Sequence, residues 1–341
     1  MRAQRIGGVA DPAEVVRRLG AVQAQDFAGV KWALGVRGGA PAEVERALDD
    51  GAVLRMHAMR GTWQLVAAED ARWLVELVAD AVLAKLVRRE TELGIDAAKR
   101  RRAFAAIERA LDAGAHRTRE ELREAIERAG VRFEGPGLSH VLGHAELERR
   151  ITSGAQRRAQ TTWAAFDARA PNARRLHREE ALAVLARRYF ESRGPATLSD
   201  FTWWSGLAIG DARAACASLR GAIEQTKDAM WRARDVPAPP ERAPAHLLPA
   251  FDELLIGYRN RDAVLDPRHA ARVNPNGGLL APCVLVGGRV VGTWRRDLAR
   301  GAVRIAVTPF ARLERGARAA IAEAAERYAR FVDRAPELSW T

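Results

Sequence analysis

The sequence has few of the residues that mark secreted, metal-binding or membrane proteins. It contains only two cysteines, Cys216 and Cys283, which are far apart and lack neighbouring metal ligands. This excludes a disulfide framework. No apolar run approaches the ~20 residues of a membrane span, and the N-terminal residues lack the apolar stretch of a signal peptide. We therefore expect a reduced, soluble, cytoplasmic protein.

Motifs for metal or cofactor chemistry are also missing. The seven histidines are scattered, and none lies in a His-Glu-x-x-His pattern or beside paired cysteines. There is no glycine-rich phosphate loop and no serine nucleophile elbow. We expect neither a metal nor a cofactor, and any enzymatic activity must use ordinary side chains.

Basic charge is abundant. The chain has 341 residues, a formal charge of +12 and 48% hydrophobic residues, which is enough for two or three buried cores. A basic excess of this size favours a polyanionic partner, most simply double-stranded DNA. The alternative is that a GC-rich genome encodes an ordinary protein with many arginines. We expect a monomer.

The order of elements repeats along the chain. Helices followed by a short strand pair occur three times, which is the layout of a winged helix. Asp11-Pro12 indicates one helix start, and Thr118 with Glu121 forms a capping box at another. The sequence predicts a mainly α protein with small β wings. Its expected parts are a first winged helix in residues 1–90, a second in 91–172, a third in 173–240, and a small α+β part in 241–341.

Two features separate the C-terminal part from the rest. Pro237-Ala238-Pro239-Pro240 is typical of a linker. Beyond it, a strand ending at Val286 and another starting at Arg289 are joined by the two-residue turn Gly287-Gly288. A long amphipathic helix is expected from Ala311 to Val332.

Five segments in a fixed order resemble the AlkZ-like winged-helix DNA glycosylases, which are bacterial proteins with tandem winged helices. The resemblance covers about residues 5–335 and is carried by the segments Val22-Gln23-Ala24-Gln25-Asp26, Met59-Arg60-Gly61-Thr62, Gly206-Leu207, Leu248-Pro249-Ala250-Phe251-Asp252-Glu253 and Val290-Val291-Gly292-Thr293-Trp294-Arg295-Arg296. It implies removal of alkylated bases from DNA, and for some members the unhooking of interstrand crosslinks or self-resistance to a genotoxin.

The resemblance also implies the catalytic residues. The family motif is Gln-aliphatic-Gln in one branch, which Gln23-Ala24-Gln25 matches, so Gln23 and Gln25 are the expected catalytic pair. One departure is that Gln64 stands where a histidine often follows the Arg-Gly-Thr segment. A role that depends on that histidine is not transferred.

The chemistry of two amides restricts the reaction. A neutral amide neither takes nor gives a proton near pH 7, but it can hold a water and offer partial negative charge to a developing cation. This suits a base already made cationic by alkylation. We expect a helix that begins near Val22 to carry the pair, yet residues two apart on a helix are separated by about 200°. Both side chains can share one site only at a helix end or an irregular turn.

Asp26 is the alternative catalytic group, because a carboxylate directly after the pair could act as a base or stabilise positive charge. The competing interpretation is a surface acid or an ion-pair partner of Arg37 or Arg60. The segment from Tyr258 to Arg261 has no evident role.

Several polar residues are candidates for DNA binding. Arg55, His57 and Arg60 lie on or beside the first strand pair. A wing tip with arginine and glutamine suits phosphate or minor-groove contact, and the second hairpin places Gln156, Arg157, Arg158 and Gln160 there. The alternative function is a non-catalytic winged-helix DNA-binding protein or transcriptional regulator.

Overall fold

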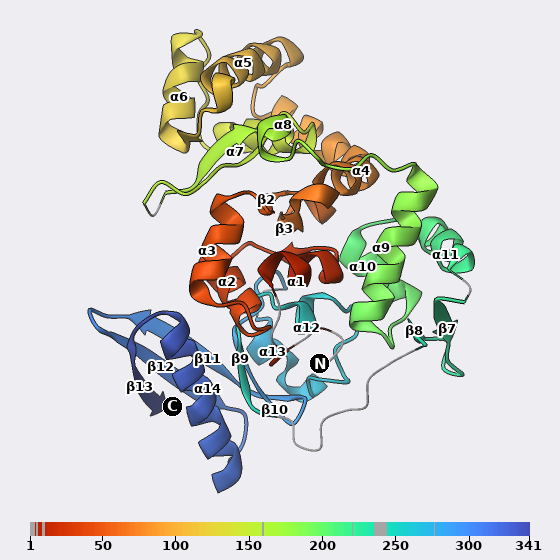
Figure 1. Ribbon diagram of the computed structural model, residues 1–341, viewed down its shortest axis with the longest axis vertical. Helices are drawn as coiled ribbons and strands as arrows, with labels where there is room; N and C mark the ends of the chain where they lie inside the picture. Colours follow the sequence, from red (N-terminus) through yellow and green to blue (C-terminus); the bar gives the residue numbers. More distant parts are fainter. Residues whose placement is uncertain are drawn as a thin grey trace. The chain divides into compact units, whose positions relative to one another are not determined.

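The computed structural model describes residues 4, 6–8, 11–158, 160–219, 221–234, 244–275 and 277–341 (Figure 1). Helices dominate and the sheets are small. The chain divides into two compact units. The first comprises residues 1–44, 186–204 and 208–341, and the second comprises residues 45–185 and 205–207. The expected linker at Pro237-Ala238-Pro239-Pro240 lies outside the described residues.

The first unit begins with helices and ends with a sheet. Its helices are α1 (Pro12–Leu19), α2 (Phe27–Gly35), α10 (Leu198–Ser205), α11 (Ile209–Ser218), α12 (Glu253–Ile256), the 3₁₀ turn η4 (Pro267–His269), α13 (Ala270–Val273) and α14 (Arg315–Phe331). Its strands are β1 (Val22–Gln23), β7 (Ile223–Gln225), β8 (Trp231–Ala233), β9 (His246–Leu248), β10 (Cys283–Val286), β11 (Arg289–Leu298), β12 (Ala302–Pro309) and β13 (Ala335–Trp340).

A five-stranded sheet with the order β13-β12-β11-β10-β9 organises the C-terminal part of this unit. Its pairs are antiparallel except β12 with β13, which is parallel. Val303, Ile305 and Val307 are buried along β12, which is the period of two expected where one face of a strand packs on a core. β13 was not expected from the sequence. It contains Pro336, and an edge strand tolerates proline because one side of its backbone needs no partner.

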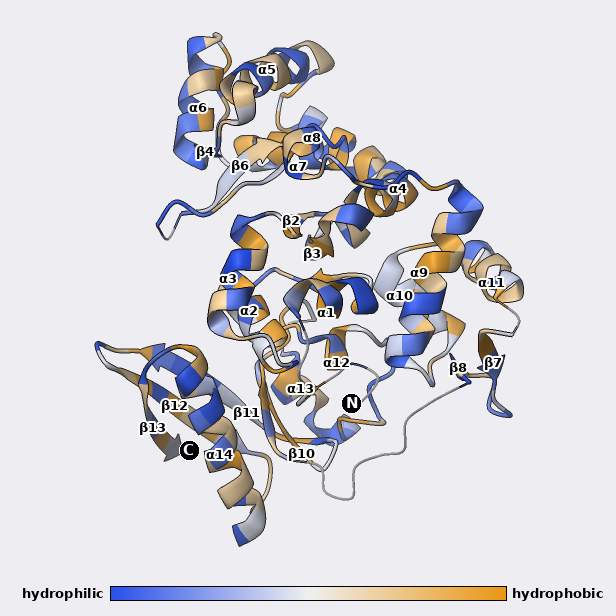
Figure 2. Cartoon of the chain, viewed as in Figure 1, coloured by the Kyte–Doolittle hydropathy of each residue, from blue (hydrophilic) through white to orange (hydrophobic). Residues whose placement is uncertain are grey.

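The long helix α14 covers this sheet (Figure 1). Its buried residues Ile321, Ala324, Ala325 and Tyr328 recur at helical spacing, and Figure 2 shows the mixture of hydrophobic and hydrophilic residues along it. The expected amphipathic helix and the two-glycine turn before β11 are both confirmed. Gly287 and Gly288 have φ values of 57° and 81°, which the short hairpin turn requires.

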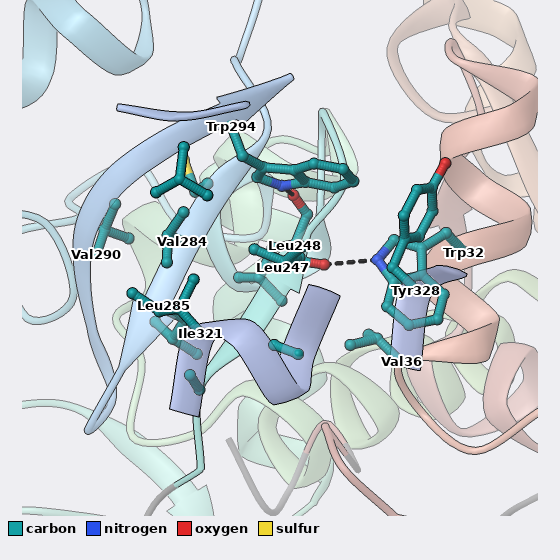
Figure 3. Packing of buried hydrophobic residues seen from close by; sticks show 14 of the residues in the cluster. Trp32, Val36, Leu247, Leu248, Val284, Leu285, Val290, Trp294, Ile321 and Tyr328 are labelled. Carbon is teal, nitrogen blue, oxygen red and sulfur yellow. Dashed lines mark hydrogen bonds between the residues drawn. The ribbon is translucent and has the colours of Figure 1, made fainter. Parts of the chain in front are cut away.

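Three aromatic residues, Trp32, Trp294 and Tyr328, pack among aliphatic side chains in the core of this unit (Figure 3). The ring centroids of Trp32 and Trp294 lie 5.1 and 5.0 Å from that of Tyr328, both edge to face. Each indole also satisfies its N–H. Trp32 Nε1 donates to the Leu247 carbonyl at 2.5 Å, and Trp294 Nε1 donates to the Leu248 carbonyl at 2.7 Å. The Trp32 bond fixes α2 against β9, and the Trp294 bond connects β11 to β9.

The second unit contains the strand pair β2 (Val53–His57) and β3 (Trp63–Ala67), the strand pair β5 (Ile151–Ser153) and β6 (Thr162–Ala165), the short strand β4 (Arg117–Thr118) beside β6, and most of the remaining helices. Its helices and 3₁₀ turns are η1 (Met59–Gly61), η2 (Ala68–Asp70), α4 (Ala71–Glu92), α5 (Ala97–Ala110), η3 (Asp112–Gly114), α6 (Arg119–Arg128), α7 (Gly137–Leu147) and α8 (Phe166–Arg169). Helices α3 (Pro41–Asp49) and α9 (Arg178–Arg193) belong partly to each unit, and Ser205, the last residue of α10, belongs to the second.

Local signals in the sequence set several of these boundaries. The capping box at α6 is confirmed, with Thr118 and Glu121 bonded reciprocally. The side chain of Asp11 caps α1. The strand pairs β2–β3, β5–β6 and β7–β8 are all antiparallel, as expected. Leu122, Ile126 and Trp163 belong to the core of the second unit.

A buried histidine gives the first unit a dependence on acid. His246 on β9 is 3% exposed. Burial, with the positive charges of Arg327 and Arg37 and against the opposing charge of Asp252, lowers the pKa of His246 to about 4. An unfolded histidine has a pKa near 6.5, so between about pH 6.5 and 4 the unfolded chain binds more protons than the folded one. Stability must therefore fall on acidification across this window.

We expect His246 to account for about 3 kcal/mol of stability lost between about pH 7 and pH 4. Urea unfolding of the wild type and of His246→Phe at both pH values measures this contribution. The variant should lose about that much less stability on acidification. Identical losses in the two proteins would contradict the assignment.

Candidate active site

The glutamine pair does not lie on a helix, so the expectation of a helix beginning near Val22 was wrong. Gln23 belongs to strand β1, and Gln25 lies in the bend before α2, which begins at Phe27. The reason is the helix cap: the Asp26 side chain accepts the Gly29 N–H at 2.9 Å, and a capping residue lies outside the helix. The pair therefore does not have the separation of about 200° that residues two apart on a helix have; Gln23 is buried and Gln25 is exposed.

The backbone of Gln23 is held by a buried carboxylate. The Gln23 N–H donates to Glu253 Oε1 at 2.8 Å, and the Glu253 residue is completely buried. Its Oε2 accepts from Arg193 Nη2 at 2.5 Å and from Trp204 Nε1 at 3.0 Å. Arg193 in turn donates to the Leu19 carbonyl at 2.8 Å. Strand β1 is thus connected to α9, α10 and α12 through one side chain.

A second buried ion pair stands beside the first. Arg37 binds both carboxylate oxygens of Asp252, at 2.8 and 2.9 Å, and its Nε donates to the Gln4 carbonyl at 3.0 Å. Burial opposes the charge of Arg37, but Asp252 outweighs it and raises the pKa of the guanidinium. Asp252 also caps α12 by accepting the Leu254 N–H. In the acidic pair, Asp252 therefore has a structural role, and Glu253 binds the backbone of Gln23.

Asp26 is occupied in two ways. Besides capping α2, it forms an ion pair with Arg296 of β11, at 3.2 Å. The interpretation as an ion-pair partner is supported, but the expected partners Arg37 and Arg60 were wrong. These contacts compete with a role for this carboxylate as a base.

Comparison with known proteins identifies the family of the chain. The family described as DNA glycosylase AlkZ-like matches residues 16–331. The chain belongs to the AlkZ-like DNA glycosylase family. It is similar to an interstrand DNA cross-link repair glycosylase of Streptomyces sahachiroi, with 27% identity over 326 residues that cover 89% of this chain and 85% of the relative.

A solved structure has the same fold. The Streptomyces sahachiroi DNA glycosylase AlkZ superposes with a TM-score of 0.80 at 22% identity, covering all of this chain and 97% of that one. As a member of this family, the protein is a DNA N-glycosylase.

In this glycosylase the segment from Tyr258 to Arg261 supports the residues around Glu253. The Tyr258 hydroxyl donates to the Arg193 carbonyl at 2.8 Å. The Arg259 N–H donates to Asp200 at 2.9 Å, and Arg261 Nε donates to the Leu255 carbonyl at 2.8 Å. The segment that had no evident role from sequence thus joins α12 to α9 and α10.

Arg55 and His57, both expected to bind DNA, pack against aromatic and acidic groups of the second unit. The guanidinium of Arg55 lies 4.0 Å from the centre of the Trp63 ring, and burial, partly offset by Glu146, lowers its pKa to about 10. His57 Nδ1 lies 2.6 Å from Glu146 Oε2, and Trp163 Nε1 donates to the other oxygen of this buried carboxylate.

Arg60 lies at the turn between β2 and β3 with a φ of 58°. A Cβ on Gly206 would come within 3.1 Å of Arg60 Cγ, so Gly206 of the family-like Gly206-Leu207 segment allows this close approach. Gln64, which stands where a histidine is frequent, is buried and donates to the Thr62 hydroxyl at 2.9 Å.

The β5–β6 hairpin carries the remaining four candidates for DNA binding. They differ in how their side chains are bonded within the protein. Gln156 Nε2 donates to Glu45 at 2.9 Å, and Arg157 binds Glu121 at 2.6 Å and the His116 carbonyl at 2.7 Å. Arg158 and Gln160 are exposed. In the described part of the chain, the Arg158 side chain forms no ion pair. Figure 1 shows this loop extending beyond α7.

Sequence reasoning missed the roles of Glu253, Arg193 and Arg37. The available signal was Asp252-Glu253 next to the apolar residues of α12, because a buried acidic pair needs cationic partners. Among the described residues, no group of His, Cys, Asp and Glu side chains could hold a metal ion. None of the helices described is both long enough and apolar enough to cross a bilayer.

Proposed function

We propose that this glycosylase hydrolyses the N-glycosidic bond of purines made cationic by alkylation at N7 or N3, and that Gln23 and Gln25 are its catalytic residues. The observation that supports this is the placement of the pair. Gln23 lies on an extended strand whose backbone is bound to the buried Glu253 carboxylate at 2.8 Å, and Gln25 lies in the following bend, exposed at the surface.

The chemistry follows from what amides can do. A cationic alkylpurine leaves without first being protonated, so no acid is needed. The sugar then becomes oxocarbenium-like, and the carbonyl dipoles of the two glutamines stabilise it. The same amides hold the water that attacks C1′, because an amide offers both a donor and an acceptor. No cofactor takes part.

We propose that the repeated helices and hairpins hold double-stranded DNA as tandem winged helices. The supporting pattern is α1–α3 before β2–β3, α6–α7 before β5–β6, and α9–α11 before β7–β8. The three proposed winged helices correspond to residues 1–90, 91–172 and 173–240, with residues 241–341 as the α+β part. We further propose that the protein acts as a monomer in the cytoplasm.

We also propose bulky adducts or interstrand crosslinks as substrates. The basis is the similarity to a relative named as an interstrand DNA cross-link repair glycosylase. A bulky lesion need not be flipped fully out of the helix, although full flipping is the commoner route in glycosylases.

One side-by-side assay tests the substrate class. Duplexes carrying 7-methylguanine, a bulky N7 adduct, or an N7 interstrand crosslink are incubated with the protein, and the released base is separated by chromatography. We expect release of 7-methylguanine and of at least one larger N7 adduct, leaving an abasic site. If none of these duplexes loses its modified base, the proposed substrate class is wrong.

The wing of the second hairpin gives a separate prediction about DNA affinity. Arg158→Ala is expected to weaken binding to any duplex sequence and to reduce the slope of log K against log salt by about 1, since one phosphate contact is lost. Binding is measured by fluorescence anisotropy at several salt concentrations. Arg123→Ala is the control, because this arginine of α6 is paired with Glu120 and Glu127. Equal slopes for wild type and Arg158→Ala would remove Arg158 from the interface.

A further inference from the structure

A cavity of about 310 Å³ lies in the first unit. Neither Gln23 nor Gln25 lines it. It is formed by the turn at Gly7, the C-terminal end of α2, the first residue of α3, the start of β9 and the end of α14. The lining residues that matter here are Gly7, Trp32, His246, Arg327, Arg330 and Phe331. Its volume is at the low end of the roughly 300–1,000 Å³ of small-molecule sites.

His246 presents a polar atom that the fold leaves unsatisfied. The residue is 3% exposed, and its Nε2 is buried with no hydrogen-bond partner among the described residues. Buried polar atoms are almost always bonded. Gly7 has a φ of 75°, and a Cβ there would lie 3.0 Å from His246 Cε1. Glycine therefore brings the turn close to the imidazole.

The charged side chains that line the cavity are positive. Two arginines line it, and no carboxylate is among the described lining residues. Arg327 Nη2 donates to the Ala245 carbonyl at 2.5 Å, which leaves other N–H groups of this guanidinium to bind a ligand. Arg330 is paired only loosely with Glu326, at 3.8 Å on an exposed helix face, and such pairs are weak.

The remaining lining is apolar and partly aromatic. Trp32 and Phe331, whose ring centroids are 5.1 Å apart, line the cavity together with Val36 and Pro41. A ligand that matched every group would combine a negative charge, a hydrogen-bonding atom and a flat apolar part.

We propose that this cavity binds a small organic anion in which a phosphate or carboxylate is attached to an aromatic ring. The anionic group binds Arg327 and Arg330 through charge-assisted hydrogen bonds. The ring contacts Phe331 and Trp32, and a polar atom of the ligand bonds to His246 Nε2. This site is independent of the proposed glycosylase mechanism, because none of its residues belongs to the group around Gln23.

The test uses phenyl phosphate and benzoate as probes, with benzyl alcohol as the neutral counterpart. Binding is followed by calorimetry and by the ring ¹⁵N signals of the histidines. We expect saturable binding of at least one anion, little binding of benzyl alcohol, and a shifted His246 signal. The absence of saturation at about 10 mM of either anion, where even millimolar affinity is detectable, would overturn the proposal.

Variants separate this site from general attraction to a basic protein. Arg330→Gln and His246→Phe are each expected to weaken binding of the anion at least tenfold, and thermal melting checks that both remain folded. Arg315→Gln is the matched control, since Arg315 is exposed at the other end of α14. Equal weakening by the control would overturn the assignment. Displacement of phenyl phosphate by a short undamaged duplex would show that the cavity binds a phosphate of DNA, and would overturn the proposal of a small organic anion.

Discussion

We expect Gln23→Met and Gln25→Ala each to lower the single-turnover rate of 7-methylguanine release by about 10²-fold or more, because removing one preorganised dipole at a developing charge typically costs that much. Methionine keeps the length and volume of the buried Gln23 side chain and removes its amide. Gln25 is exposed, so alanine there leaves the core intact. Base release is measured with enzyme in excess over the lesion duplex.

DNA affinity distinguishes a catalytic effect from a binding effect. Both variants should bind the lesion duplex within a fewfold of the wild type, since the phosphate contacts that dominate affinity are unchanged. Gln225→Ala, at an exposed position of β7, is the matched control and should keep the full rate. Wild-type rates in both glutamine variants would remove the pair from the mechanism.

The second large effect is expected at Glu253. This carboxylate accepts the Gln23 N–H as well as N–H groups of Arg193 and Trp204. Glu253→Gln leaves Arg193 buried without a counter-charge, and we expect a loss of about 3–5 kcal/mol of stability. The variant should also release base slowly, because Gln23 loses its fixed position. Urea unfolding and single-turnover kinetics measure the two losses.

A double variant separates stability from positioning. In Arg193→Met with Glu253→Gln no buried charge lacks a partner, so most of the stability should return. Two N–H donors remain, those of Gln23 and Trp204, and they bond to different oxygens of the carboxylate, of which an amide at position 253 keeps only one. We therefore expect the rate to stay at least tenfold low at unchanged DNA affinity. A double variant with both wild-type stability and wild-type rate would show that Glu253 does not position Gln23.

Local signals predicted much of the fold. The caps of α1 and α6, the two-glycine turn and the three strand pairs each depend on residues close in sequence. β13 could not be found in this way, because a parallel edge strand is defined by its partner β12. Pro336 is compatible with this position, because an edge strand tolerates proline.

The candidate site shows the same limit. The residue types at Gln23 and Gln25 indicated amide chemistry. The expected helix was wrong because Asp26 caps α2, so this helix begins after the pair. The contact of Glu253 with Gln23 spans 230 positions. Only the tertiary structure could show that an acid of α12 holds the backbone of β1.

The claim that the leaving group must already be cationic is tested most directly by comparing two lesions in the same duplex. Single-turnover base release is measured for 7-methylguanine, which carries a positive charge, and for O6-methylguanine, which is neutral. We expect release of 7-methylguanine alone, at a rate that depends on Gln23 and Gln25. Release of both bases at similar rates would contradict the account, because amides cannot supply the proton that a neutral purine needs to leave.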